Sequence, residues 1–200
     1  MNSLDIDSAR TSISNFSGGL QGYNEDVTIN LNGANFADII AANAEIKNIK
    51  FSGNVTGNGF LANVNNGKIT NVTIDVNGRK ASTLTVLGNN YGGGIVGINN
   101  GIIDGGQVLG LNITAANGTI GGIVGQNYGQ IKNAVVEFYN LLLSELPSET
   151  FASNKFSGYN VGAIVGEIRA NSSITNSYAY DYTLSSTSDR VIVASSNQGA

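Results

Sequence analysis

The 200-residue sequence contains no cysteine, no histidine and no tryptophan, and it has a single proline. Without cysteine there is no disulfide framework and no thiolate metal site. Without cysteine and histidine we also expect no structural zinc site, because these two residue types supply nearly all of its ligands. The absence of cysteine says nothing further about the redox compartment of the protein.

Charge is also scarce, since only 12% of the residues are charged and the net charge is −4. An acidic chain lacks the basic surface that binds nucleic acid or an anionic membrane, so we expect neither partner. No run approaches the roughly 18 apolar residues of a membrane span, and the N-terminus lacks the basic and apolar regions of a signal peptide. We therefore expect a cytosolic protein or a fragment of a longer exported one.

What the chain has in quantity is glycine, with 27 residues, together with many asparagines. These two residue types enter left-handed backbone conformations at the least cost, so a chain rich in them can turn often. A disordered chain would carry more charge and proline, whereas 41% of these residues are hydrophobic and can fill a core. The composition predicts an ordered all-β chain of many short strands and tight turns.

Two stretches in the middle of the chain are nearly identical. GGGIVGINNGIIDGG (92–106) and IGGIVGQNYGQIKNAVV (120–136) match at an offset of 28 residues. A period of this size is typical of stacked repeats, in which each unit is too small to bury its own apolar face. Weaker copies flank this pair, and we expect one isoleucine from each of five copies to stack in an interior column: Ile46, Ile69, Ile103, Ile131 and Ile174.

The apolar pattern within each copy predicts two corners. In IKNIKF, ITNVTIDV and IKNAVVEF the inward face changes parity at an asparagine, which predicts a corner at Asn48, Asn71, Asn133 and Asn176. A second corner fits the Asn-x-Gly step after each GGIVG strand, where Asn99 and Gly101, or Asn127 and Gly129, would take positive φ. Strands and corners that alternate in this way predict a β-solenoid with parallel pairing between coils.

The asparagines of the Asn-x-Gly steps occupy equivalent positions in successive copies. We therefore expect Asn65, Asn99 and Asn127 to form a ladder in which side-chain amides bond from coil to coil. Asn154 lies outside this pattern, and we expect it at the surface.

The pattern GGxVGxNxGxIxN resembles the GLUG motif, a repeat of β-helical surface proteins such as filamentous-haemagglutinin-type adhesins and IgA-protease-like exported proteins. The motif's tetrad corresponds to residues 94–97, 122–125 and 163–166, with isoleucine in place of the usual leucine, and the resemblance covers about residues 16–180. It implies a right-handed parallel β-helix, here of about six or seven coils, on an exported protein. It implies no catalytic residue, because the motif is structural.

We expect residues 1–200 to form one solenoid domain. Residues 1–17 would be an N-terminal cap, 18–184 the repeat coils with side insertions at 77–90 and 139–160, and 185–200 a terminal strand and tail. In the cap, Ile6, Ala9, Ile13 and Phe16 have the spacing of one face of a short helix. The alternative for this segment is a strand pair built on LDI and SIS.

The sequence predicts no catalytic residue, no cofactor and no metal site. Acid–base catalysis needs two carboxylates held close together, whereas those of the repeats fall at different points of the coil: Asp75, Asp104, Glu137, Glu167 and Asp181. Two oxygen-rich stretches, residues 5–7 and 24–26, could hold calcium weakly, but the pattern favours ordinary polar turns.

The insertion at 139–160 interrupts the period, and insertions project from the side of a solenoid, where binding surfaces often lie. It adjoins a strand with alternating tyrosines. The predicted ligand-binding residues are Leu142, Glu145, Glu149, Tyr178, Tyr180 and Tyr182. The alternatives are that the insertion covers one face of the stack and that the tyrosines fill the rim of the core.

The predicted function is that of a non-catalytic, extracellular β-helix module of a bacterial surface protein, acting as an adhesin or a stalk. Its expected partner is a host or self glycan, or a protein, at the side of the solenoid, and its expected location is the cell surface. One alternative is a self-assembling filament subunit, because parallel coils leave unpaired edges at both ends unless these are capped. The other is an enzyme that acts on polysaccharides.

Overall fold

The computed structural model describes residues 2–7, 12–22, 27–78, 80–137, 154–180, 182–188 and 191–192. The regular secondary structure of these residues is all β-strand, in three sheets of 15, six and four strands, which we call sheets I, II and III. No helix occurs in these residues, and therefore none that could cross a membrane.

Sheet I contains β1 (Asn2–Asp7), β3 (Gly19–Gln21), β4 (Val27–Gly33), β6 (Glu45–Thr56), β8 (Lys68–Ile74), β9 (Ser82–Val86), β12 (Ile102–Asp104), β13 (Gln107–Val108), β14 (Leu111–Ala115), β17 (Gln130–Lys132), β18 (Val135–Val136), β19 (Asn154–Gly158), β22 (Ser173–Thr175), β23 (Tyr178–Ala179) and β24 (Tyr182–Ser186). Sheet II contains β2 (Ile13–Phe16), β5 (Ala37–Ile40), β7 (Ala62–Asn65), β11 (Val96–Asn99), β16 (Val124–Asn127) and β21 (Val165–Ile168). Sheet III contains β10 (Tyr91–Gly93), β15 (Thr119–Gly121), β20 (Asn160–Gly162) and β25 (Val191–Ile192).

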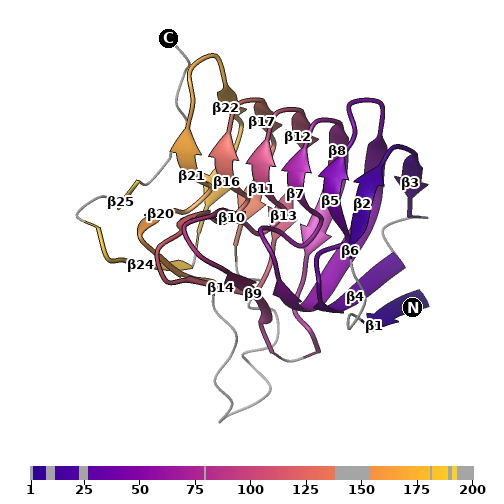
Figure 1. Ribbon diagram of the computed structural model, residues 1–200, viewed down its shortest axis with the longest axis horizontal. Helices are drawn as coiled ribbons and strands as arrows, with labels where there is room; N and C mark the ends of the chain where they lie inside the picture. The colour runs from indigo at the N-terminus through magenta and orange to yellow at the C-terminus, as the bar shows by residue number, and fades with distance from the viewer. Residues whose placement is uncertain are drawn as a thin grey trace.

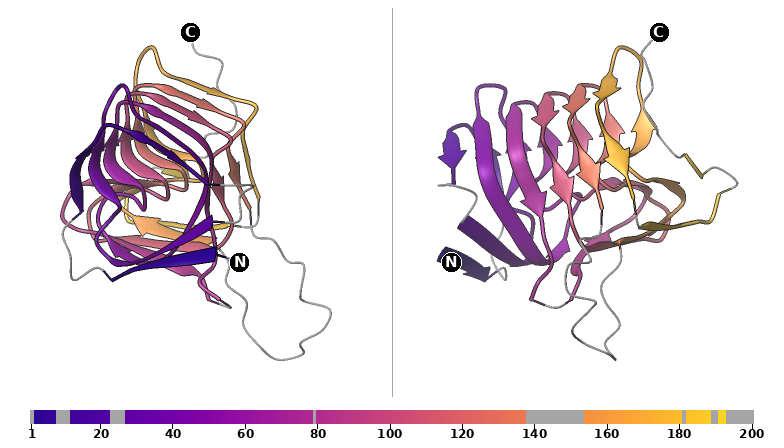
Figure 2. Two further views of the ribbon diagram at one scale, coloured as in Figure 1. Left: turned by 90° about the vertical axis from the view of Figure 1, so that its right-hand side faces the viewer. Right: turned by 180° about the vertical axis from the view of Figure 1, so that it is seen from behind.

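Successive strands of each sheet come from successive stretches of the chain, and we call each such stretch a pass. Sheet II shows this most simply, with the order β2-β5-β7-β11-β16-β21 (Figure 1). The pairs between its neighbouring strands are all parallel. The passes therefore lie one behind another around a shared interior, as the left view of Figure 2 shows.

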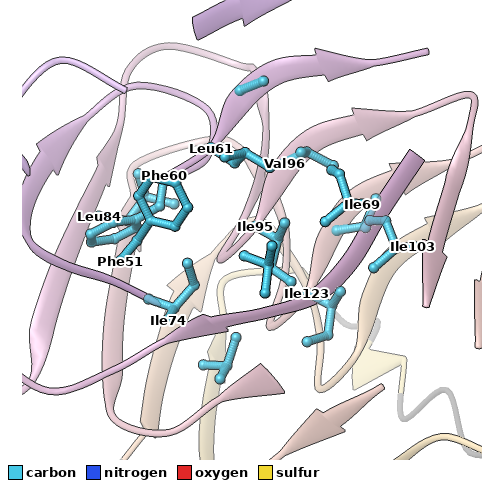
Figure 3. Close-up of a cluster of buried hydrophobic side chains, with 14 of the residues drawn as sticks. Phe51, Phe60, Leu61, Ile69, Ile74, Leu84, Ile95, Val96, Ile103 and Ile123 are labelled. Carbon is cyan, nitrogen blue, oxygen red and sulfur yellow. The ribbon is translucent and has the colours of Figure 1, made fainter. Parts of the chain in front are cut away.

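The repeat alignment is confirmed by the strand register. Val96 of β11 pairs with Val124 of β16, which is the predicted offset of 28 residues. The five anchoring isoleucines are consecutive partners in sheet I, and all are buried: Ile46, Ile69, Ile103, Ile131 and Ile174. Each contributes roughly 1.5–3 kcal/mol by leaving water, and Figure 3 shows Ile69 and Ile103 side by side in the core.

The first predicted corner is confirmed, and we call it the φ corner. Asn48, Asn71, Asn133 and Asn176 have φ between 48° and 56°, and Gly105 takes the equivalent place in the pass between Asn71 and Asn133, with φ of 74°. Asparagine and glycine suit this corner because they adopt the left-handed region at the least cost.

The second corner, which we call the ladder corner, lies where predicted, but the predicted positive φ is wrong. Neither Asn99, Gly101, Asn127 nor Gly129 is among the described residues with positive φ. Glycine is needed here for space instead, because a Cβ on Gly101 would overlap the carbonyl oxygen of Gly67 in the preceding pass. The backbones of successive passes thus approach closely at this corner.

The predicted N-terminal helix is wrong within the described residues of 1–17. Residues 2–7 form β1 and residues 13–16 form β2, so the alternative of strands at LDI and SIS is correct for their conformation. These strands do not pair with each other, because β1 pairs with β4 and β2 pairs with β5. Pairing with the next pass satisfies backbone groups along the edges of β4 and β5, which a helix could not do.

Both segments predicted as side insertions contain a strand of the stack. Residues 82–86 form β9, which pairs with β6 on one side and β14 on the other. Most of the segment 139–160 lies outside the described residues, which resume with β19 and β20 at its end.

Candidate functional site

The three tyrosines predicted to bind a ligand do not share one face. Tyr178 and Tyr180 are 52% and 65% exposed. Tyr182 lies in β24 in register with Asn154 and Leu111, which are both buried, and its side chain packs against the core. Tyr178 and Tyr180 therefore face outward, whereas Tyr182 is half-buried against the core. The other predicted binding residues, Leu142, Glu145 and Glu149, lie outside the described residues.

The exposed Tyr178 is tied to an acidic neighbour. Its hydroxyl donates a hydrogen bond of 3.1 Å to the Glu137 carboxylate in the preceding pass. Partial burial and this bond to a negatively charged acceptor together raise the pKa of Tyr178. The contact links two passes, and it leaves Tyr180 as the least restrained aromatic ring of this surface.

Two other described carboxylates bond to amide and ammonium groups rather than to a second carboxyl group. Asp104 accepts a hydrogen bond of 2.7 Å from the Asn133 amide. Glu45 lies 3.0 Å from the Lys68 ammonium, and this hydrogen bond, with the charge of Lys47, lowers the pKa of Glu45. Within the described residues, no three Asp, Glu, His or Cys side chains gather closely enough to hold a metal ion. Of the two stretches considered for calcium, residues 24–26 lie outside the described residues, and residues 5–7 are described by backbone alone.

The predicted asparagine ladder is confirmed. The Asn65 amide donates a hydrogen bond of 2.8 Å to the Asn99 side-chain oxygen, and the Asn99 amide donates one of 2.8 Å to the Asn127 oxygen. All three side chains are fully buried. The Asn65 oxygen also accepts from the Gly67 backbone N–H at 3.0 Å, and the Asn127 oxygen accepts from that of Gly129 at 3.3 Å. The ladder thus holds the ladder corners of three successive passes together.

A groove runs over the outside of this ladder and encloses about 420 Å³. Its floor is the glycine column Gly67, Gly101 and Gly129, and its ends are marked by Ala42 and Asn171. Because a Cβ on any of these three glycines would overlap backbone of the preceding pass, the floor carries no side chains. We call this surface the corner groove.

Two rows of outward side chains form the walls of the corner groove. One wall consists of Asn66, Asn100 and Tyr128, which precede the floor glycines. The other consists of Lys68, Ile102 and Gln130, which follow them and pair in register across β8, β12 and β17. Each of the three central passes therefore contributes one wall residue, one floor glycine and a second wall residue.

Tyr128 is held in place at the C-terminal end of the corner groove. The Arg169 guanidinium lies 5.8 Å from the centre of the Tyr128 ring, and its position is fixed by a 2.9 Å ion pair with Glu167. Burial alone would lower the pKa of Arg169, but the Glu167 charge and the hydroxyls of Tyr91 and Tyr128 outweigh it and raise the pKa. The guanidinium stays charged, and the Tyr128 ring remains 46% exposed.

The corner groove was not predicted from the sequence, although the repeats contain a pattern that indicates it. NNGK, NNGI and NYGQ each place two outward residues around a glycine, at residues 65–68, 99–102 and 127–130. The glycine was interpreted as a turn residue with positive φ rather than as a position where a side chain has no room. Because this lack of room was not recognised, the two columns of side chains that flank the glycines could not be identified as walls of a groove.

Comparisons with protein-family models, with curated proteins and with solved structures find no match for this chain. The resemblance to the GLUG motif thus rests on the repeat residues themselves.

Proposed function

We propose that this chain is a right-handed parallel β-helix of six or seven coils that serves as a non-catalytic stalk or adhesive module of a bacterial surface protein. It is displayed outside the cell as part of a longer exported protein or fibre. The resemblance to the GLUG motif supports this assignment. So does the parallel pairing of passes in all three sheets.

The handedness and number of coils have separate support. Connections between parallel strands of one sheet are right-handed in roughly 98% of cases, because right-handed twist favours that crossover. Sheet II has six strands, and β1 pairs with β4 ahead of the pass that begins with β2. Six coils with part of a seventh agree with this arrangement.

The observation that carries the non-catalytic role is the use of side chains for stacking. The buried isoleucine column and the asparagine ladder join pass to pass. The described carboxylates bond to cations, amides and hydroxyls of neighbouring residues such as Lys68, Asn133 and Tyr178. A catalytic acid and base would need two such groups facing a common space. These contacts join successive passes into one continuous stack.

Surface labelling of intact source cells tests the location. An antibody raised against residues 91–136 should label unpermeabilised cells, and brief external protease treatment should remove the signal. Labelling that requires permeabilisation would overturn the extracellular assignment. Incubation of the protein with acidic polysaccharides tests the enzyme alternative, and we expect no release of reducing or unsaturated ends.

The filament alternative is favoured by the edges of the sheets. Among the described residues, β2 and β3 at one end and β21 and β22 at the other each pair on one side only. Unpaired parallel edges can accept a further pass from the same chain or from another copy. Measurement of molecular mass across concentration separates the two: a constant monomer mass supports the stalk, and growth without limit supports the filament.

A further inference from the structure

We propose that the corner groove binds an extended neutral glycan, with Tyr128 as the stacking surface and the amides of Asn66, Asn100 and Gln130 as hydrogen-bonding groups. This surface is distinct from the Tyr178 and Tyr180 surface that the sequence favoured. The proposal deepens the adhesive role and in that respect rests on the proposed function.

The shape of the groove calls for an extended ligand. It draws lining residues from five neighbouring passes, from Ala42 to Asn171. Four steps between parallel strands amount to roughly 20 Å, since neighbouring strands lie about 4.8 Å apart. The same wall, glycine, wall unit recurs at each central step, which suits a polymer whose own units repeat.

The floor of the groove cannot bind a peptide as an added strand. The carbonyl oxygens of Gly67, Gly101 and Gly129 already accept backbone hydrogen bonds from the next pass, at 2.9 to 3.0 Å. The backbone N–H groups of the same glycines donate within the ladder corner. Strand addition requires unpaired backbone groups, so recognition falls to the side chains of the walls.

The wall amides retain capacity for a hydroxyl-rich partner. The Asn100 amide donates a hydrogen bond of 2.8 Å to the Asn66 oxygen. Within the described part of the chain, this leaves the Asn66 N–H groups and the Asn100 oxygen without another side-chain partner, and both residues line the groove. An amide offers a donor and an acceptor together, which matches sugar hydroxyls, because these also do both.

The aromatic and charged groups point to a neutral rather than an anionic glycan. Tyr128 presents a ring that is already oriented by Arg169, so little freedom is lost when a sugar face packs on it. The one lysine of the walls, Lys68, is already paired with Glu45 at 3.0 Å. Net charge of −4 further disfavours a polyanion.

Binding to defined polysaccharides tests the proposal. The purified chain would be titrated with dextran, mannan and a soluble β-glucan as neutral probes, and with hyaluronan and alginate as acidic probes. We expect saturable binding to at least one neutral probe. Absence of binding to all neutral probes overturns the proposal, as does binding confined to the acidic ones.

Matched variants locate the site. Tyr128→Ala should weaken binding about tenfold, the usual scale for loss of an aromatic anchor, whereas Tyr128→Phe should stay within about twofold because it keeps the ring. Tyr159→Ala is the control, since Tyr159 is 49% exposed and lies outside the groove lining. Asn100→Ala should weaken binding as well, with Asn117→Ala as its exposed control. Equal affinities for Tyr128→Ala and Tyr159→Ala would place the site elsewhere and overturn the proposal.

The salt dependence of binding distinguishes the ligand class, and the affinity should change by less than about twofold as the salt concentration is raised if the glycan is neutral. Strong loss of affinity at high salt would identify an anionic ligand and overturn the proposal as stated. Melting temperatures of all variants show whether each is folded, and Asn100→Ala serves if Tyr128→Ala is not. These outcomes do not depend on surface labelling, so a cytosolic protein with a working groove, or an exported one without it, would be recognised.

Discussion

The three central passes turn at two corners that are both rich in asparagine and glycine, yet the two residue types serve different purposes at the two corners. At the φ corner, asparagine adopts positive φ and its side chain is largely exposed, as at Asn71 and Asn176. At the ladder corner, asparagine has ordinary φ and its amide is fully buried, as at Asn99. Glycine supplies backbone freedom at the first corner and absence of volume at the second. The same two residue types thus meet two different requirements, positive φ at one corner and close packing of backbones at the other.

The largest expected effect comes from placing asparagine at the glycine of the ladder corner. Gly101→Asn puts a Cβ onto the Gly67 carbonyl oxygen, which is backbone and cannot move without separating two passes. We expect a loss of roughly 4 kcal/mol or more in the free energy of unfolding, or no folded protein at all.

Gly105→Asn is the matched change at the φ corner. Four other passes carry asparagine there with φ between 48° and 56°, so the backbone already suits it. The atom that a Cβ would meet first is the Asn71 side-chain oxygen, which can rotate away. Chemical denaturation should show a change within about 1 kcal/mol. Similar losses for Gly101→Asn and Gly105→Asn would contradict the distinction between the two corners.

The second prediction compares neighbouring asparagines of the ladder corner. Asn99→Leu keeps the volume but removes the amide between Asn65 and Asn127, which leaves buried polar groups without that partner. We expect a loss of about 2–4 kcal/mol, since each unpaired buried group costs about 1–3 kcal/mol. Asn100→Leu, one residue along and exposed, should cost less than about 1 kcal/mol. Equal melting temperatures for the two variants would show that the ladder only shapes the turn.

The ladder and the isoleucine column could be predicted from the sequence because both depend on a repeated period. A fixed offset between copies places equivalent residues in register, whatever the exact path of the chain. The φ corner was also predictable, since the apolar pattern changes parity at its asparagines. In each case the signal was carried by several copies rather than by one residue.

Features set by a single contact could not be predicted in this way. Asn154 was expected at the surface but is fully buried, because its side-chain oxygen accepts a hydrogen bond of 2.9 Å from the Leu111 backbone N–H. Tyr182 was assigned to the face of Tyr178, but it continues an inward column that includes Leu111. The N-terminal helix failed for a related reason, since pairing of β1 and β2 with later strands outweighs the local helical spacing.

The third prediction isolates the backbone requirement of the φ corner. Asn176 is exposed with φ of 48°. Asn176→Ala should cost about 1–2 kcal/mol, because alanine adopts this conformation with strain. Asn176→Gly should be close to neutral, since glycine does not. Thermal unfolding of both variants checks the order, and a more stable alanine variant would mean that the side chain, rather than φ, selects asparagine.

The smallest expected effect on stability comes from the ion pair between Glu45 and Lys68, which, unlike the uncharged ladder, should depend on pH. The Lys68 hydrogen bond and the Lys47 charge hold the pKa of Glu45 below its ordinary value of 4.5. A carboxylate whose pKa is lowered by folding stabilises the protein above its unfolded pKa, and this contribution is lost as the pH falls through the folded pKa. The difference in melting temperature between the wild type and Glu45→Gln should therefore be small and positive at pH 7.

That difference should shrink toward zero as the pH falls through and below 4.5, the range in which Glu45 becomes protonated. The deficit of Asn99→Leu should not follow this course, because amides do not titrate. Melting curves of the three proteins at pH 7, 5, 4 and 3 provide the measurement. A Glu45→Gln difference that persists unchanged at pH 3 would mean that Glu45 acts through packing rather than charge. The ion pair beside the ladder corner would then make no electrostatic contribution to stability.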